Sequence, residues 1–215
     1  DYLKVMIPLM QKYGIKVPDK EFACVPFNSQ EGQRYFRAMA AAANYAWANR
    51  QMITYYVRKA WAKAMSGGSS SASPLAPLYD VAHNIIKKEQ YVIDGKEIEV
   101  AVHRKGATRA FVGQPVLIPG SMGTASYILV GQKQGEEAFY STNHGAGRTM
   151  SRHEAMRRVS GQEVIKTLES KGIIIKCRSA RGIAEEAPMA YKNIDDVVAV
   201  IQSAGLSKKV ARLVP

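Results

Sequence analysis

The chain has 215 residues, enough for one large domain or two small ones with a hydrophobic core. Its hydrophobic content of 47% excludes a disordered tail, and it has no apolar run near the ~18–20 residues that cross a bilayer. The excess of 30 Lys and Arg over 18 Asp and Glu gives a formal charge of +12. This charge favours a polyanionic partner such as nucleic acid, a nucleotide or an acidic surface. A basic soluble protein without such a partner is the alternative.

The cysteines and the first residues indicate where the protein works. Cys24 and Cys177 lie far apart in dissimilar contexts, which argues against a disulfide framework and for a reducing, intracellular compartment. No signal peptide is visible. Because the chain begins Asp-Tyr-Leu without a methionine, we expect a fragment, a processed product or a trimmed chain.

The first predicted element is one long helix over residues 27–65. Asn28 is its expected cap, and Glu31 lies three residues later, the spacing of a capping box. Large apolar residues recur at helical spacing, which predicts a central helix buried in the core. These residues are Phe36, Met39, Trp47, Ile53, Val57 and Trp61.

A Gly/Ser-rich stretch at 66–77 is typical of a flexible loop or linker. Residues 91–106 alternate like a strand pair around Asp94-Gly95, which is a favourable hairpin turn. Residues 114–131 predict two apolar strands separated by the sequence PGSMGT.

Two capped helices are predicted at 160–172, with Ser160 and Glu163 as a capping box, and at 193–205. The sequence IIIKC (173–177) predicts a strand between them. Helices and strands do not alternate strictly, so we expect an α+β fold with mixed sheets packed against helices.

The stretch YSTNHGAGRTMSR (140–152) has the clearest chemical signature. Glycine-rich backbone N–H groups can bind a phosphate, and Arg148 and Arg152 can add charge-assisted hydrogen bonds to its oxygens. His144 would then lie beside an electrophilic phosphorus, toward which imidazole is a competent nucleophile. The alternative is a structural histidine at a tight turn.

Three further segments can contribute to a site. In YDVAHN (79–84), Asp80 and His83 share a face if the segment is helical; an aspartate cap beside a packed histidine and a metal ligand both fit. HRKGATR (103–109) clusters cations around a glycine, and PGSMGTAS (119–126) offers hydroxyls suited to a ribose, base or phosphate. HRKGATR and PGSMGTAS match neither a Walker loop nor a dinucleotide-binding fingerprint.

Taken together and in this order, YDVAHNI, HRKGATRAF, GQPVLIPGSMGTASYIL, STNHGAGR…SR and EEAPMAYKN resemble the RtcB-type RNA ligases of tRNA splicing, in the archaeal and eukaryotic style. The resemblance implies a GTP- and manganese-dependent enzyme. It would join RNA ending in a 2′,3′-cyclic phosphate or 3′-phosphate to RNA bearing a 5′-hydroxyl, with tRNA halves as substrates. It also implies an archease-type activating partner and a cytoplasmic location, nuclear as well in a eukaryote.

The resemblance assigns roles to individual residues. His144 matches the histidine that becomes guanylylated, His83 matches a manganese ligand, and Asn84 lies near the GTP phosphates. Lys105, Arg148 and Arg152 match basic positions for RNA phosphate, and we expect Arg109 on the same face. The implied nucleotide contacts are Ser121, Ser126, Ala146, Gly147 and Tyr191.

The sequence also departs from the family pattern. The other metal ligands belong to an N-terminal half that we expect this chain to lack, Val112 alone joins RAF to GQPV, and the terminal lysine of the family is absent. We therefore treat 1–215 as a single region, the C-terminal portion or a trimmed form of a ligase. The competing hypothesis is a non-catalytic remnant that binds RNA or a nucleotide.

Overall fold

The computed structural model describes residues 2–66 and 75–215, and the fold is α+β as predicted. The chain divides into two compact units, the first ending at His103 and the second running from Arg104 to Pro215. Most of the predicted linker at 66–77 falls on residues 67–74, which lie outside the described residues.

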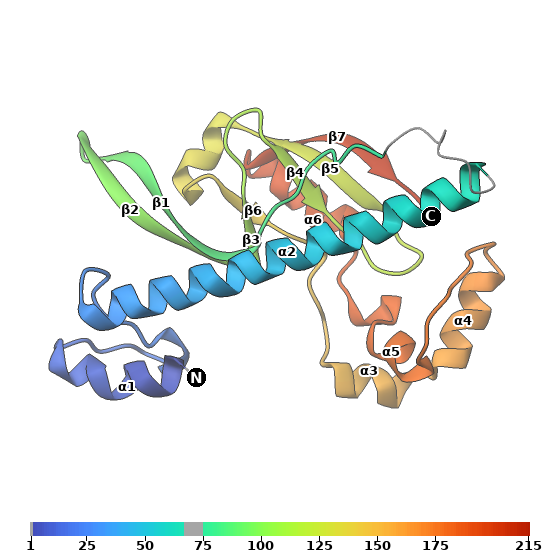
Figure 1. Cartoon of the computed structure of the whole chain (residues 1–215), viewed down its shortest axis with the longest axis horizontal. Helices are drawn as coiled ribbons and strands as arrows, with labels where there is room; N and C mark the ends of the chain where they lie inside the picture. Colours follow the sequence, from blue (N-terminus) through green and yellow to red (C-terminus); the bar gives the residue numbers. More distant parts are fainter. Residues whose placement is uncertain (1, 67–74) are drawn as a thin grey trace. The chain divides into compact units, whose positions relative to one another are not determined.

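The first unit starts with α1 (Tyr2–Lys12) and a short 3-10 helix η1 (Lys20–Phe22), followed by the predicted long helix α2 (Gln30–Ser66) (Figure 1). The Ser29 hydroxyl accepts the Gly32 N–H at 3.0 Å, which satisfies a backbone donor in the first turn. The predicted cap at Asn28 is therefore wrong by one residue.

The predicted burial of α2 is also wrong. Phe36, Met39 and Trp47 are half-buried, but most other large apolar side chains between Tyr45 and Met65 are exposed, and Ile53 is 53% exposed. Helical spacing predicted the helix correctly; it did not show that another element covers its apolar side chains. No helix in the described ranges is long and apolar enough to span a membrane.

The hairpin prediction is confirmed by β1 (Asn84–Ile93) and β2 (Lys96–Lys105). Asp94 and Gly95 have φ angles of 51° and 75°, the left-handed pair that a two-residue turn requires. The segment before β1 is not helical, so Asp80 and His83 do not share a helix face. Asp80 instead accepts a hydrogen bond from Arg50 Nε at 2.6 Å.

A three-stranded antiparallel sheet forms the centre of the second unit. The predicted strands of 114–131 are β4 (Pro115–Ile118) and β5 (Ser126–Gly131), and the strand β7 (Ser207–Leu213), which was not predicted, pairs with the other edge of β5. The predicted helix α6 (Ile194–Ser203) packs on this sheet (Figure 1). The buried side chains between them include Val116, Ile118, Leu129, Ile194, Val198 and Ile201.

Three helices and two 3-10 helices complete this unit: η2 (Lys133–Ala138), α3 (Arg152–Arg158), α4 (Gly161–Glu169), α5 (Ala180–Glu185) and η3 (Pro188–Ala190). The capping box of Ser160 and Glu163 is present at the start of α4, as predicted. The strand predicted at 173–177 is absent: Ile173 and Ile175 pack against the α4–α5 cluster, without a strand to pair with.

Candidate functional site

A short strand pair brings together two of the motifs found in the sequence. β3 (Ala107–Arg109) pairs antiparallel with β6 (Ser141–Asn143), with Ala107 opposite Asn143. HRKGATR and NHGAGR therefore lie side by side in the second unit. A Cβ atom added at Gly106 would lie 3.3 Å from His144 Nε2. Glycine at this position thus leaves the space beside the imidazole uncrowded.

His144 lines a cavity of about 710 Å³. The residues that line it include the small residues Ala146 and Gly147 together with Lys192, Asn193 and Asp196. Asn143 shapes the loop, because its side-chain amide donates to the Gly145 carbonyl at 2.8 Å. The predicted nucleophile and two of the predicted nucleotide contacts therefore share one cavity.

A second cavity of about 490 Å³ contains Ser121 and Tyr191. Lys192 and Asn193 line both cavities, so the second cavity adjoins the first. Ser126 shapes the loop at the end of β4: its hydroxyl accepts the Gly120 N–H at 3.3 Å. The structure thus groups five of the six predicted nucleotide contacts around His144 and this loop.

The sixth, Asn84, belongs to the first unit. It starts β1, directly after His83, and both side chains are exposed. In the described part of the chain, no group of three or more His, Cys, Asp or Glu side chains could hold a metal ion.

Arg148 joins the histidine loop to the segment that carries Tyr191. Its guanidinium donates to the carbonyls of Met150 and Glu185 at 3.1 and 2.7 Å, and its Nη1 lies 3.0 Å from the Tyr191 hydroxyl. It also stacks over the Tyr191 ring at 4.8 Å. A backbone hydrogen bond also connects the two segments, because the Lys192 N–H donates to the Gly147 carbonyl at 3.0 Å.

Sequence reasoning missed Glu186, which lies at the centre of this network. Its carboxylate accepts hydrogen bonds from Arg148, Arg152 and Tyr191. Burial acts to raise the pKa of Glu186, but these hydrogen bonds and the two positive charges outweigh burial, so the pKa lies below its usual range. Burial, followed by Glu186, raises the pKa of Tyr191. The acidic pair in EEAPMAYKN was the available signal in the sequence.

The remaining predicted cations are Lys105, at the end of β2, and Arg109, at the end of β3. Lys105 is exposed, and Arg109 donates to the Gln114 side chain at 3.2 Å and stacks over Phe111 at 4.8 Å. The second unit as a whole carries 17 Lys and Arg against 9 Asp and Glu, a net charge of +8, and the first unit carries +4. The basic excess is therefore largest in the unit that contains His144.

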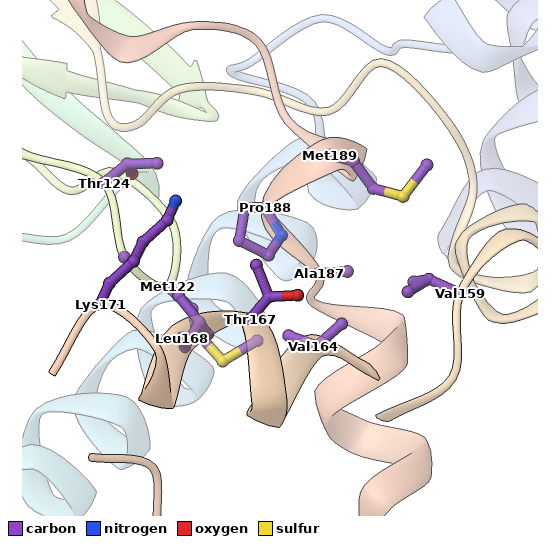
Figure 2. A pocket seen from close by; sticks show the side chains of 11 residues that line it. Met122, Thr124, Val159, Val164, Thr167, Leu168, Lys171, Ala187, Pro188 and Met189 are labelled. Atoms are coloured by element: carbon purple, nitrogen blue, oxygen red, sulfur yellow. The ribbon is translucent and has the colours of Figure 1, made fainter. Parts of the chain in front are cut away.

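A separate apolar cavity of about 270 Å³ lies between α4, η3 and the 121–125 turn. Figure 2 shows Val164, Leu168 and Met122 pointing into it, with Lys171 rising from the end of α4 toward Thr124. Gly123 and Thr124 line both this cavity and the one that contains Tyr191. The turn is therefore supported from behind by apolar side chains.

The fold and site define an α+β protein with a candidate phosphate-binding centre around one histidine. The family model of the tRNA-splicing ligase RtcB matches residues 1–215. The chain belongs to this family, and the resemblance found in the sequence is confirmed.

Relatives from archaea and bacteria match the whole chain. It is 54% identical to the tRNA-splicing ligase RtcB of Archaeoglobus fulgidus over 229 residues, covering 47% of that protein. It is 52% identical to the tRNA-splicing ligase RtcB of Pyrococcus horikoshii, covering 26%, and 51% identical to the RNA-splicing ligase RtcB of Mycobacterium tuberculosis, covering 51%. The chain thus spans about half or less of the length of these relatives.

Proposed function

We propose that this chain carries the guanylylation centre of a GTP- and manganese-dependent RNA ligase. The ligase joins RNA ending in a 2′,3′-cyclic phosphate or 3′-phosphate to RNA bearing a 5′-hydroxyl, in tRNA splicing or RNA repair. Membership of a family of tRNA-splicing ligases supports the reaction class. The position of His144 supports the assignment of the nucleophile.

The single observation that carries the proposal is the cavity at His144. An imidazole that acts as a nucleophile needs room for a phosphorus atom beside its ring nitrogen, and Gly106 and the loop of Ala146 and Gly147 leave that room. A histidine with a purely structural role at a turn does not require a cavity of about 710 Å³ next to it.

Three displacements at phosphorus complete the reaction. A nitrogen of His144 attacks the α-phosphorus of GTP, forms a P–N bond and releases pyrophosphate. An oxygen of the RNA 3′-phosphate then attacks the bound GMP phosphorus and releases the imidazole; a cyclic phosphate must first be opened by water. Finally, the 5′-hydroxyl of the second RNA attacks the activated 3′-phosphorus, and GMP leaves as the new phosphodiester forms.

Manganese is implied by the resemblance, but the described residues do not form a site for it by themselves. His83 supplies one imidazole, and a metal ion held by one protein ligand competes poorly with water. We place the remaining ligands in the part of the relatives' length that this chain does not cover. We therefore assign none of the three displacements at phosphorus to the metal.

For the RNA, we propose the side of the second unit that carries Lys105, Arg109 and Arg152. Lys105 ends β2, Arg109 is the last residue of β3 and pairs with Ser141 of β6, and Arg152 starts α3, eight residues after His144. Phosphate contacts of this kind give affinity without sequence specificity. We do not assign Arg148 to RNA, because its hydrogen bonds hold the loop after His144 to the segment that carries Tyr191.

The test is labelling with GTP that carries ³²P at the α-phosphate, in the presence of manganese, on a ligase of full family length that contains this chain. The label should attach to the protein, resist alkali and disappear in acid, as a P–N bond does. His144→Ala should abolish labelling, and His153→Ala, which changes an exposed histidine of α3, should retain it. Labelling that survives His144→Ala would refute the assignment.

A non-catalytic protein that binds RNA or a nucleotide is the competing function. The net charge of +8 on the second unit fits this function as well, because such a charge favours a polyanionic partner whether or not a covalent step follows. It predicts that GTP or RNA binds to the full-length protein while no covalent label forms.

A further inference from the structure

The two carboxylate oxygens of Glu186 have different partners. Oε2 accepts a hydrogen bond from the Tyr191 hydroxyl and lies 3.2 Å from Arg148 Nη1. Oε1 accepts a hydrogen bond from Arg152 Nε at 3.1 Å. One side chain therefore connects the tyrosine of the nucleotide site to a cation that we assign to RNA.

The two arginines differ in how freely they can leave Glu186. The Arg148 side chain is 23% exposed and has further partners in two backbone carbonyls and the Tyr191 ring. The Arg152 side chain is 63% exposed, and Glu186 is the one partner that the described residues give it. An exposed ion pair of this kind contributes about 0–1 kcal/mol. Another anion can therefore replace Glu186 more readily at Arg152 than at Arg148, which is half-buried and is also held by its other partners.

We propose that Glu186 is a positioning residue that holds Arg152 in the free protein and is exchanged there for a phosphate oxygen when RNA binds. Its second oxygen keeps Arg148 and Tyr191 in place throughout. The proposal rests on the proposed function, since it requires RNA near His144. Carboxylate and phosphate oxygens accept the same charge-assisted hydrogen bond from a guanidinium, so the exchange conserves the bonding of Arg152.

The consequence is that Glu186 weakens RNA binding while it orders the site. A residue that is only structural would do the reverse, because its loss would disorder the site and reduce the affinity. The sign of the change in affinity therefore separates the two roles.

The chain offers a matched control for this test. Glu185 precedes Glu186 and has the same charge, but its carboxylate pairs with Arg181 at 3.2 Å. Glu185→Gln thus removes one negative charge from the same segment but leaves the ion pair between Glu186 and Arg152 in place.

The measurement is the affinity of a single-stranded RNA with a 3′-phosphate, by fluorescence anisotropy at fixed salt. Breaking a pair worth about 0–1 kcal/mol raises the affinity up to about fivefold, so we expect Glu186→Gln to tighten binding by about two- to fivefold. Glu185→Gln should change it by less than about twofold. In a protein that already carries Arg152→Ala, Glu186→Gln should increase the RNA affinity by no more than Glu185→Gln does.

The outcomes distinguish this proposal from the proposed function. In one outcome, Arg152→Ala weakens RNA binding while Glu186→Gln raises the affinity no more than Glu185→Gln does. That result would refute the exchange at Glu186 but would still support the proposed RNA site. If Arg152→Ala leaves the affinity unchanged, the RNA path proposed above is wrong, and the exchange with it.

A second measurement needs no variant. Burial raises the pKa of Glu186, and the hydrogen bonds from Tyr191 and then Arg152 lower it below its usual range. Loss of the Arg152 hydrogen bond when RNA binds should therefore raise that pKa, as followed by carboxyl NMR. A pKa of Glu186 that saturating RNA leaves unchanged would overturn the exchange even if Glu186→Gln fails to fold.

Discussion

The two units differ in where their apolar side chains lie. In the first unit, α2 is 37 residues long, and many of its large apolar side chains are exposed. In the second unit, strands of four and six residues place Ile118 and Leu129 at 0% exposure between the sheet and α6. The exposed group on α2 comprises Tyr45, Met52, Ile53, Tyr55, Tyr56, Val57, Trp61 and Met65.

The helical spacing of apolar residues suggests both that a helix forms and that its apolar side chains are buried. The difference between the units shows that these are separate properties. Helical spacing and a capping serine are local signals, and they are sufficient to predict that a helix forms. Burial depends on a second element whose apolar face fits the first, and that element can lie anywhere along the chain. In this chain the apolar residues of two short strands identify the core better than the apolar residues of the long helix α2 do.

The largest expected effect tests this comparison directly. Leu129→Ala should lower the free energy of unfolding by about 2–5 kcal/mol, because it leaves a cavity in a closely packed core. Ile53→Ala on α2 should change it by no more than about 0.5 kcal/mol, since that side chain is already 53% exposed. Urea denaturation followed by circular dichroism measures both. A loss at Ile53 as large as that at Leu129 would show that the side chain is buried in solution.

A smaller effect is expected where the 121–125 turn meets α4. Gly123 has a φ of 73°, and a Cβ added there would overlap Leu168 Cδ2. Gly123→Ala should thus add the crowding of an overpacked core, about 1–3 kcal/mol, to the strain of a left-handed alanine of about 1 kcal/mol. Thermal or urea denaturation should show this loss of stability.

Gly172→Ala is the control for Gly123→Ala. Its φ is 76°, and a Cβ there meets nothing within 4 Å, so strain alone should remain. Equal losses for the two variants would mean that Leu168 moves aside and that the turn is not held by the helix cluster.

Local signals predicted the elements that short-range interactions determine. The Asp94-Gly95 turn and the caps at Ser160 and Asn193 are formed as expected, because each depends on a few neighbouring residues. Pairing between distant segments was not predictable in this way. β7 carries Lys208 and Lys209 at the edge of the sheet and pairs with a strand about 80 residues earlier.

The same limit applies to the candidate site. The order of the motifs identified His144 and the loops around it, and the pairing of β3 with β6 brings them together. Glu186 was missed because its role depends on Arg152 and Arg148, which precede it by 34 and 38 residues. A single sequence shows that these charges exist, but it does not show which of them pair.

The smallest expected effect concerns one carboxyl group in the first unit. Glu31, in the first turn of α2, accepts hydrogen bonds from the Tyr13 hydroxyl at 2.8 Å and from Lys12 Nζ at 3.0 Å. The Tyr13 hydrogen bond, followed by a backbone hydrogen bond and Lys12, lowers the pKa of Glu31 to about 2. Because the folded pKa lies below the usual value of 4.5, this carboxylate stabilises the fold above pH 4.5 and loses that contribution as the pH falls toward 2.

Tyr13→Phe tests which partner causes this shift. It should raise the pKa of Glu31 more than Lys12→Gln does, since the tyrosine hydroxyl has the largest influence. Carboxyl NMR titration measures the change, and Glu163 in the second unit, whose pKa is lowered by hydrogen bonds from Ser160, should be unaffected by either variant. A midpoint near 4.5 for Glu31 in the unchanged chain would mean that α1 does not hold the start of α2 in solution. The contact between α1 and α2 would then be weaker in solution than the hydrogen bonds of Glu31 with Tyr13 and Lys12 indicate.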